Sequence, residues 1–203
     1  MNRLPKSFYT RSDVVQISQD LLGKYLVTRI DGALSSGMIV ETEAYCAPDD
    51  KACHAWNNRR TARTEIMFAE GGCAYVYLCY GIHHLFNVVT GPQESAQAVL
   101  IRAIAPADNT ELLLKRRGKN VLRPQLTAGP GVMSKALGIS TQYNGTDLIA
   151  KDSPIWIEDR GEVVKKTAIA SGPRVGVAYA DECAEWPWRF WIKDSRWVSK
   201  WKK

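Results

Sequence analysis

One pair of β-forming runs separated by a tight turn constrains the fold of this chain most. Residues 24–30 and 37–45 are rich in residues that favour strands, and the loop between them contains Asp31 and Gly32. This pattern predicts a β-hairpin. Strands joined by so short a connection must run antiparallel, because a parallel pair needs a long crossover.

The rest of the chain continues this scheme. A second hairpin is expected around Gly81, and the almost continuously apolar segment 98–105 predicts a third sheet region. The expected strands are residues 24–30, 37–45, 74–80, 82–90, 98–105, 154–158, 174–178 and 189–193, and the expected helices are a helix capped by Ser12 or Asp13 that runs to Leu22, residues 109–117 and residues 132–137. The fold class is therefore α+β with a mainly antiparallel sheet and peripheral helices. With 203 residues, of which 45% are hydrophobic, residues 1–203 are expected to form a single domain.

Charge and composition narrow the functional classes. The chain carries 27 Lys and Arg against 21 Asp and Glu, a formal net charge of +6 that favours an anionic partner such as nucleic acid. No membrane-length apolar run and no secretory signal is evident, so a soluble cytoplasmic protein is expected. The five cysteines contain no CxxC pair, which argues against a disulfide framework and a zinc knuckle.

The segment 37–45 carries two carboxylates close together. If no bulge intervenes, two-residue alternation places Ile39, Glu41, Glu43 and Tyr45 on one face. A charged strand end that faces solvent would give the same pattern. The periodicity does not choose between Glu41 and Glu43 as a reactive group.

Arg102 interrupts the apolar segment 98–105. A buried guanidinium is costly unless it is paired, so a carboxylate or a bound polar group is expected beside it. A purely structural ion pair explains Arg102 as well as a functional role does.

Aromatic residues accompany these charges. Alternation places Tyr75 and Tyr77 on one face, and Tyr80 stands beside the hairpin Gly81, where a side chain can project and insert into a base stack. Together with Tyr45 and His54, and with the basic stretch containing Arg59, Arg60 and Arg63, they predict an aromatic pocket near a phosphate-binding surface.

Metal sites are disfavoured. The spacing of the cysteines and histidines (Cys46, Cys53, His54, Cys79, His83, His84) matches no common zinc pattern. A two-metal nuclease would need Glu41, Glu43, Asp49 and Asp50 to converge, and no specific motif supports it.

In combination, the motifs resemble the alkyladenine (3-methyladenine) DNA glycosylase family. The resemblance covers roughly residues 8–200 in family order and rests on IVETEAY at 39–45, ACH at 52–54, RRTAR at 59–63 with Met67-Phe68, YVYLCYG at 75–81 through Asn87-Val88-Val89, VLIRA at 99–103, Gly129-Pro130, RVGV at 174–177 and PWRF at 187–190.

The resemblance implies a set of roles for individual residues. Glu43, rather than Glu41, would be the general base, with Arg102 and the backbone carbonyl of Val175 holding the attacking water. Tyr45, His54 and Tyr77 would form the walls of the base pocket, Asn87 would screen out unmodified guanine, and Tyr80 would fill the gap left by a flipped nucleotide. Further DNA contacts would fall at or near Arg59, Thr61, Arg63, Met67 and Lys135.

The resemblance also implies the activity and the fold. It implies a base excision repair enzyme that hydrolyses the N-glycosidic bond of alkylated or deaminated purines in duplex DNA, without lyase activity, cofactor, metal or obligate protein partner, and a monomer is expected. The fold would be similar to the C-terminal domain of methionyl-tRNA formyltransferase. Two other classes fit the aromatic and basic residues: a non-catalytic damaged-DNA-binding protein and an RNA-binding module.

The sequence departs from the family pattern near the expected pocket. Thr64 and Ile82 replace an expected Asn and Met, and His83-His84 replaces a more usual aromatic or single-His pattern. These departures bear on lesion preference more than on reaction type.

Overall fold

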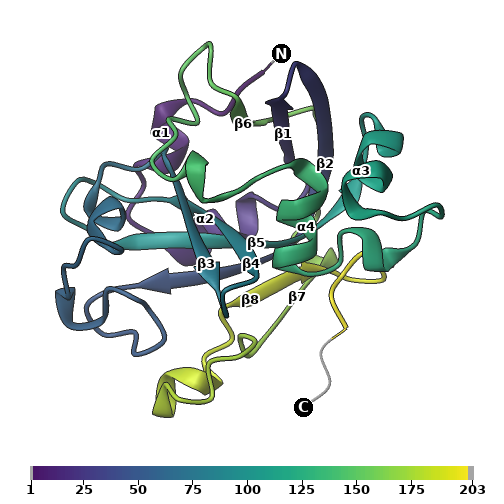
Figure 1. The fold of residues 1–203 in the computed structure, drawn as a ribbon. Coiled ribbons are helices and arrows are strands. Elements are labelled where there is room, and N and C mark those ends of the chain that lie inside the picture. The colour runs from purple at the N-terminus through teal and green to yellow at the C-terminus, as the bar shows by residue number, and fades with distance from the viewer. Residues whose placement is uncertain (1, 201–203) are drawn as a thin grey trace.

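The fold is organised around one long central strand, β2 (Ala33–Cys46). The computed structural model describes residues 2–200, and these form an eight-stranded antiparallel sheet (Figure 1). One edge of β2 pairs with β5 (Gln97–Pro106), and the other edge pairs first with β1 (Tyr25–Ile30) and then with β8 (Arg189–Ile192). The sheet order is β3-β4-β5-β2-β1-β6, with β8 beside β2 and β7 beside β8, and the remaining strands are β3 (Ala74–Cys79), β4 (His83–Val89), β6 (Ile155–Glu158) and β7 (Ile169–Gly172).

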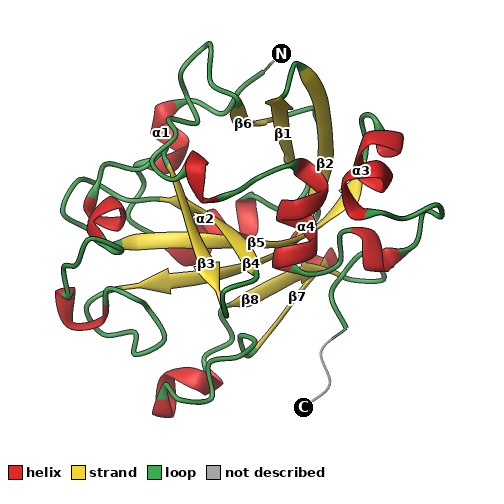
Figure 2. Cartoon of the chain, viewed as in Figure 1, coloured by secondary structure: helices red, strands yellow, loops and turns green. Residues whose placement is uncertain are grey.

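The helices around this sheet are few and short (Figure 2). They are α1 (Lys6–Tyr9), α2 (Val14–Asp20), α3 (Thr110–Arg117) and α4 (Pro130–Leu137), with 3-10 turns at Trp56–Asn58, Glu65–Phe68, Pro124–Leu126, Thr141–Tyr143, Lys166–Ala168 and Asp181–Glu185. Helix α2 packs against β2 and β5, and α4 packs against β4 and β5. An apolar cluster that includes Ile17, Phe86, Ile101 and Leu137 joins these layers into one α+β domain.

Local signals account for the elements that were predicted correctly. Asp31 and Gly32 adopt positive φ angles of 54° and 74°, the conformation that a two-residue hairpin turn requires. The Asp13 side chain caps α2 by accepting the amide of Gln16 at 2.9 Å, which decides between the two expected caps. Asn109 and Gly118 begin and end α3 as expected.

The prediction of a strand at residues 174–178 is wrong. These residues form a loop, and β7 lies just before them at Ile169–Gly172. The loop does not pair in the sheet because the Arg174 side chain binds Asp50, and the backbone amide of Val175 is occupied by Glu43. Smaller differences concern element ends: β2 begins at Ala33 rather than residue 37, α2 ends at Asp20 rather than Leu22, and α4 begins at Pro130.

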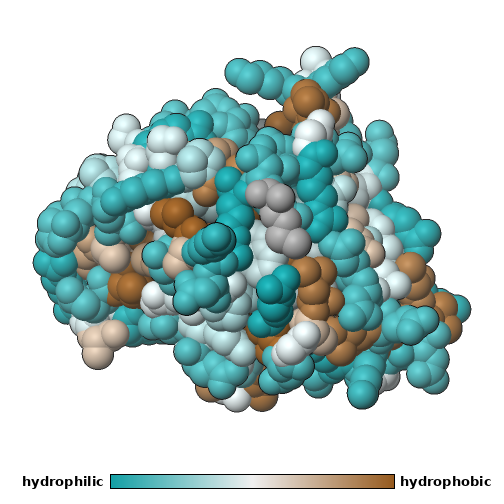
Figure 3. Space-filling view, turned by 90° about the horizontal axis from the view of Figure 1, so that it is seen from above, coloured by the Kyte–Doolittle hydropathy of each residue, from teal (hydrophilic) through white to brown (hydrophobic). Residues whose placement is uncertain are grey.

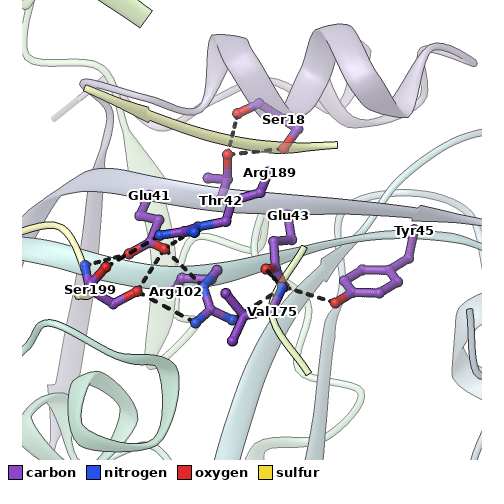
Figure 4. A network of polar contacts seen from close by, with 9 residues as sticks. All are labelled: Ser18, Glu41, Thr42, Glu43, Tyr45, Arg102, Val175, Arg189 and Ser199. Carbon is purple, nitrogen blue, oxygen red and sulfur yellow. Dashed lines mark hydrogen bonds and ion pairs between the residues drawn. The ribbon is translucent and has the colours of Figure 1, made fainter. Parts of the chain in front are cut away.

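A double irregularity interrupts the pairing of β2 with β5. Ile39 pairs with Ile104, Glu41 with Ala103 and Thr42 with Ile101, so Val40 and Arg102 have no partner in the register. Two-residue alternation therefore holds from Glu41 onward. The expectation that Ile39 shares a face with Glu41, Glu43 and Tyr45 required that no bulge intervenes, and the bulge at Val40 breaks that condition. Thr42 points toward α2, where its hydroxyl donates to the Ser18 carbonyl at 2.9 Å, while Glu41 and Glu43 face Arg102 on the opposite side (Figure 4).

One face of the molecule is mostly polar (Figure 3). Figure 3 shows hydrophilic residues over most of one face, with smaller apolar areas between them. Among residues 2–200, no helix combines the length and the apolar composition needed to cross a bilayer. The similarity to the C-terminal domain of methionyl-tRNA formyltransferase stays a prediction.

Candidate active site

Glu43 is a completely buried carboxylate surrounded by hydrogen-bond donors. Its Oε2 accepts the Tyr45 hydroxyl at 2.8 Å and Arg102 Nη1 at 3.2 Å, and its Oε1 accepts the backbone amide of Val175 at 2.7 Å (Figure 4). The motif resemblance implied a role for the Val175 carbonyl, whereas the contact with Glu43 in the structure is made by the Val175 N–H. A carboxylate has about four acceptor positions, so three donors leave one position for a further ligand.

Glu41 has a different environment although it is also completely buried. It accepts Arg102 Nε at 3.0 Å, Arg189 Nε at 2.7 Å, and both the amide and the hydroxyl of Ser199 at 2.7 Å. Three of these four donors meet at Oε1, and the Ser199 amide alone binds Oε2. The structure thus distinguishes the two carboxylates that alternation alone could not separate.

Arg102 bridges the two carboxylates and is itself 6% exposed. Burial lowers the pKa of Arg102, but the charges of Glu43 and Glu41 outweigh it and raise the pKa above its ordinary value. The guanidinium therefore stays charged. The ion pair expected for Arg102 is present, and Arg102 also lines the neighbouring cavity, while its functional role stays a prediction.

A cavity of about 750 Å³ opens next to this network, between strands β3, β4 and β5, the first residues of α4 and the loop that contains Val175. Glu43 lies next to this cavity, because it is hydrogen-bonded to Tyr45, Arg102 and Val175, each of which lines it. The lining includes most of the residues expected at the site, namely Tyr45, His54, Arg63, Met67, Tyr77, Tyr80, Asn87, Arg102 and Val175.

Aromatic rings form one wall of the cavity. His54 and Tyr77 meet edge to face with centroids 4.7 Å apart, and Tyr75 lies 5.3 Å from Tyr77. Arg63 Nη2 lies 3.3 Å from His54 Nε2, and since a guanidinium only donates, Nδ1 carries the proton and donates to the Tyr75 hydroxyl at 2.8 Å. Burial, and then the charge of Arg63, lower the pKa of His54 from 6.5 to about 4, so the ring is neutral near pH 7.

The hydroxyl of Tyr45 keeps its proton. Burial, and then the neighbouring charge of Glu43, hold the pKa of Tyr45 well above its usual value. Tyr45 therefore presents its ring to the cavity and donates its proton to the carboxylate of Glu43.

The mouth of the cavity carries an exposed apolar hairpin. Tyr80 is 89% exposed and adopts a positive φ of 51° beside Gly81, and Ile82 on the far side of the turn is 72% exposed. Arg63 places its guanidinium 4.7 Å from the centre of the Tyr77 ring. The structure thus places an exposed aromatic side chain and a cation in the lining of the same cavity.

The other expected DNA contacts are distributed more widely. Arg59 is exposed outside the cavity lining, Thr61 bonds the hydroxyl of Thr64, and Lys135 is exposed on α4. Met67 is only 2% exposed and forms part of the cavity wall rather than of the outer surface. Asn87 is 4% exposed, and its amide donates to the Tyr75 carbonyl at 3.0 Å.

Sequence reasoning gave no role to a buried ion pair between Asp50 and Arg174. The two side chains are completely buried and make two hydrogen bonds, of 2.5 and 2.7 Å. Arg174 also donates to the carbonyls of Ala44 and Cys183 and so fixes the start of the loop that carries Val175. The partners are 124 residues apart, and no local pattern signals their contact.

The carboxylates considered for a two-metal nuclease do not converge. Asp50 is committed to Arg174, and Asp49 is exposed. In the part of the chain that the structure describes, no three His, Cys, Asp or Glu side chains are grouped to hold a metal ion.

Comparisons with known proteins agree on one family. Residues 7–196 match the model of the methylpurine-DNA glycosylase family. A Chlamydia felis protein provisionally named 3-methyladenine DNA glycosylase is 45% identical over 188 residues, which cover 92% of this chain and 94% of the relative. A similarly named protein from Bacillus cereus (strain G9842) is 45% identical over 97% of this chain and 98% of its own length, and one from Chlamydia pneumoniae is 47% identical over 92% and 93%.

Proposed function

The chain belongs to the methylpurine-DNA glycosylase family, a family of DNA repair enzymes, and from this membership we propose that it excises damaged purines from duplex DNA. The substrates are alkylated or deaminated purines of the class of 3-methyladenine, 7-methylguanine, hypoxanthine and ethenoadenine. The enzyme hydrolyses the N-glycosidic bond and leaves an abasic site. The observation that carries this proposal is the buried carboxylate of Glu43 next to an aromatic cavity.

Access to the bond requires that the nucleotide leaves the duplex. Extrusion costs a few kcal/mol, and the cost is lower for a damaged base that pairs poorly. Tyr80, projecting from its hairpin, compensates by stacking in the vacated position. The flipped base then enters the cavity between Tyr45 on one side and His54 and Tyr77 on the other.

The aromatic walls favour bases that are positively charged or poor in electrons. Attraction between a cation and an aromatic face contributes on the order of 1 kcal/mol. Because His54 is neutral near pH 7, it does not repel a cationic alkylated purine. Asn87 lines the cavity, and its amide, held by the Tyr75 carbonyl, excludes the exocyclic group of unmodified guanine.

Glu43 supports departure of the base in two ways. As the bond breaks, the sugar gains oxocarbenium character, and a fixed carboxylate stabilises that charge. The same carboxylate takes a proton from the attacking water, which binds at its remaining acceptor position beside Arg102. The family resemblance assigns the carbonyl of Val175 to the same water. The three protein donors of Glu43 hold the carboxylate in one orientation.

The reaction stops at the abasic site. Cleavage of the strand by a bifunctional glycosylase needs an amine that forms an imine with the sugar. Among the described residues that line the cavity there is no lysine. We therefore expect a hydrolase without lyase activity. We also propose that it works as a monomer on damaged duplex DNA and needs neither cofactor nor metal.

The test is base release from duplexes that carry 7-methylguanine, hypoxanthine or ethenoadenine, in the presence of EDTA, by the wild type and by Glu43→Gln. Release by the wild type alone, with strand cleavage only after alkali, is expected. Glu158→Gln is a matched control, because Glu158 is also buried and paired with an arginine, Arg160, but lies on β6 away from the cavity.

Other outcomes would favour the alternative classes. Tight lesion binding without release by the wild type would contradict a glycosylase and favour a damaged-DNA-binding protein. Preference for single-stranded RNA in competition would favour an RNA-binding module.

A further inference from the structure

The C-terminal segment reaches back to the catalytic network through one residue. Ser199 donates its amide and its hydroxyl to the two oxygens of Glu41, both at 2.7 Å, and its carbonyl accepts Arg189 Nη2 at 3.3 Å. The Ser199 hydroxyl also accepts Arg102 Nη2 at 3.5 Å. Figure 4 shows Ser199 beside Glu41 and Arg102, on the side of the network away from Tyr45.

The orientation of Arg102 depends on which other donors bind the carboxylate of Glu41. Arg102 directs only Nε to Glu41 and turns Nη1 toward Glu43. A carboxylate and a guanidinium prefer to pair through two parallel hydrogen bonds. If Glu41 lacked its other donors, it would attract a second nitrogen of Arg102 and draw the guanidinium away from Glu43.

Ser199 and Arg189 supply those other donors. They contribute three of the four hydrogen bonds that Glu41 accepts, and two of the three come from Ser199. The segment is held in place by Trp197, which packs against the main apolar cluster. A stable anchor thus presents Ser199 to Glu41.

We propose that Ser199 is a positioning residue for catalysis: by donating two hydrogen bonds to Glu41 and accepting one from Arg102, it keeps Arg102 turned toward Glu43 and the cavity. The inference rests on the proposed function, since Glu43 is taken as the base. Ser199 is not part of the cavity lining and makes no hydrogen bond to Glu43, so it acts through Glu41 and Arg102.

Two substitutions at Ser199 and one nearby test the proposal. Ser199→Ala removes the hydroxyl and keeps the amide, while Ser199→Thr restores a hydroxyl. Ser195→Ala is the matched control, because its hydroxyl accepts the Trp197 amide at 3.4 Å in the same segment and makes no contact with Glu41. The measurements are the single-turnover rate of base release at saturating enzyme and, separately, the Kd for a duplex with the lesion.

The expected result is a change in rate without a change in binding. Ser199→Ala lowers the single-turnover rate about tenfold, the size expected for one lost hydrogen bond to a charged group, and leaves Kd within about twofold. Ser199→Thr recovers most of the rate, and Ser195→Ala matches the wild type. A wild-type rate in Ser199→Ala, or an equal loss in Ser195→Ala, would overturn the proposal.

A second measurement does not depend on turnover. In ¹⁵N-labelled protein, the guanidinium resonances of Arg102, assigned with Arg102→Lys, are expected to shift in Ser199→Ala and to stay in place in Ser195→Ala. If the wild type released no base from any lesion, the proposed function would fail. The Arg102 resonances would then still test whether Ser199 positions Arg102. Unchanged Arg102 resonances in Ser199→Ala would refute the positioning role.

Discussion

Replacing Asp50 by asparagine tests how the loop that carries Val175 is held. Each carboxylate oxygen of Asp50 faces a nitrogen of Arg174, at 2.5 and 2.7 Å, and Oδ1 also accepts the amide of Ala52 at 3.0 Å. Whichever way the asparagine amide turns, its NH₂ group meets a donor instead of offering an acceptor. The substitution therefore breaks one contact and leaves the guanidinium of Arg174 without a counter-charge.

The magnitude follows from burial. Both side chains have no exposed surface, and removing one partner of a buried ion pair costs about 3–5 kcal/mol. In a domain of 150–250 residues, 1 kcal/mol shifts Tm by about 2–4 °C, so Asp50→Asn should lower Tm by about 6–20 °C. Base release should also slow at temperatures where the variant is folded, because the loop loses the anchor that presents the Val175 amide to Glu43.

The assay is thermal unfolding followed by circular dichroism, with Lys51→Gln as the control. Lys51 pairs with Asp181 and Glu182 on the surface, where its side chain is 30% exposed and theirs are 71% and 66% exposed. Surface pairs contribute about 0–1 kcal/mol, which corresponds to less than about 4 °C. If Asp50→Asn destabilised the protein no more than Lys51→Gln does, the reasoning about a buried charge would be wrong.

Three further outcomes are expected. Glu43→Gln should lower the single-turnover rate by about 10²–10⁴-fold while the lesion duplex still binds. Loss of binding with an unchanged rate would show that Glu43 acts in binding and not in the chemical step. Tyr80→Ala should weaken lesion binding by about 5–150-fold, since stacking contributes about 1–3 kcal/mol, and should leave Tm unchanged because the side chain is 89% exposed; equal binding would exclude insertion. The pKa of His54 is lowered from 6.5 to about 4, so its contribution to stability is complete above pH 6.5 and is lost as pH falls toward 4. In denaturant titrations, the free energy of unfolding should therefore fall less steeply with decreasing pH for His54→Gln than for the wild type.

Much of the fold could be predicted because its signals are local. The positive φ angles at Asp31 and Gly32 set the first hairpin, and the caps at Asp13 and Asn109 begin two helices within a few residues of their apolar stripes. Two-residue alternation placed Tyr75 and Tyr77 on the same face, and both line the cavity. Interactions within one turn or one strand are encoded next to each other in the sequence.

The parts that could not be predicted depend on distant contacts. Alternation could not reveal the bulge at Val40, because it exists only in the pairing with β5. The failed strand at residues 174–178 has β-forming residues, but its polar backbone and side-chain groups find partners in Asp50 and Glu43. Propensity is a weak preference that such tertiary contacts override.

The second irregularity of the same strand pair explains how one arginine contacts two glutamates that lie in different environments. With regular pairing, Arg102 would face a residue of β2 directly. The register instead passes from the pair Glu41–Ala103 to the pair Thr42–Ile101 and leaves Arg102 unpaired, and its guanidinium reaches both Glu41 and Glu43. Beyond Arg102, the two environments diverge. Glu41 points toward Arg189 and the C-terminal segment and accepts four protein donors, while Glu43 points toward Tyr45 and the cavity and accepts three. Because Arg189 offsets the charge of Glu41, the charge of Arg102 remains available to Glu43, and the chemical difference between the two carboxylates arises from their neighbours rather than from their own identity.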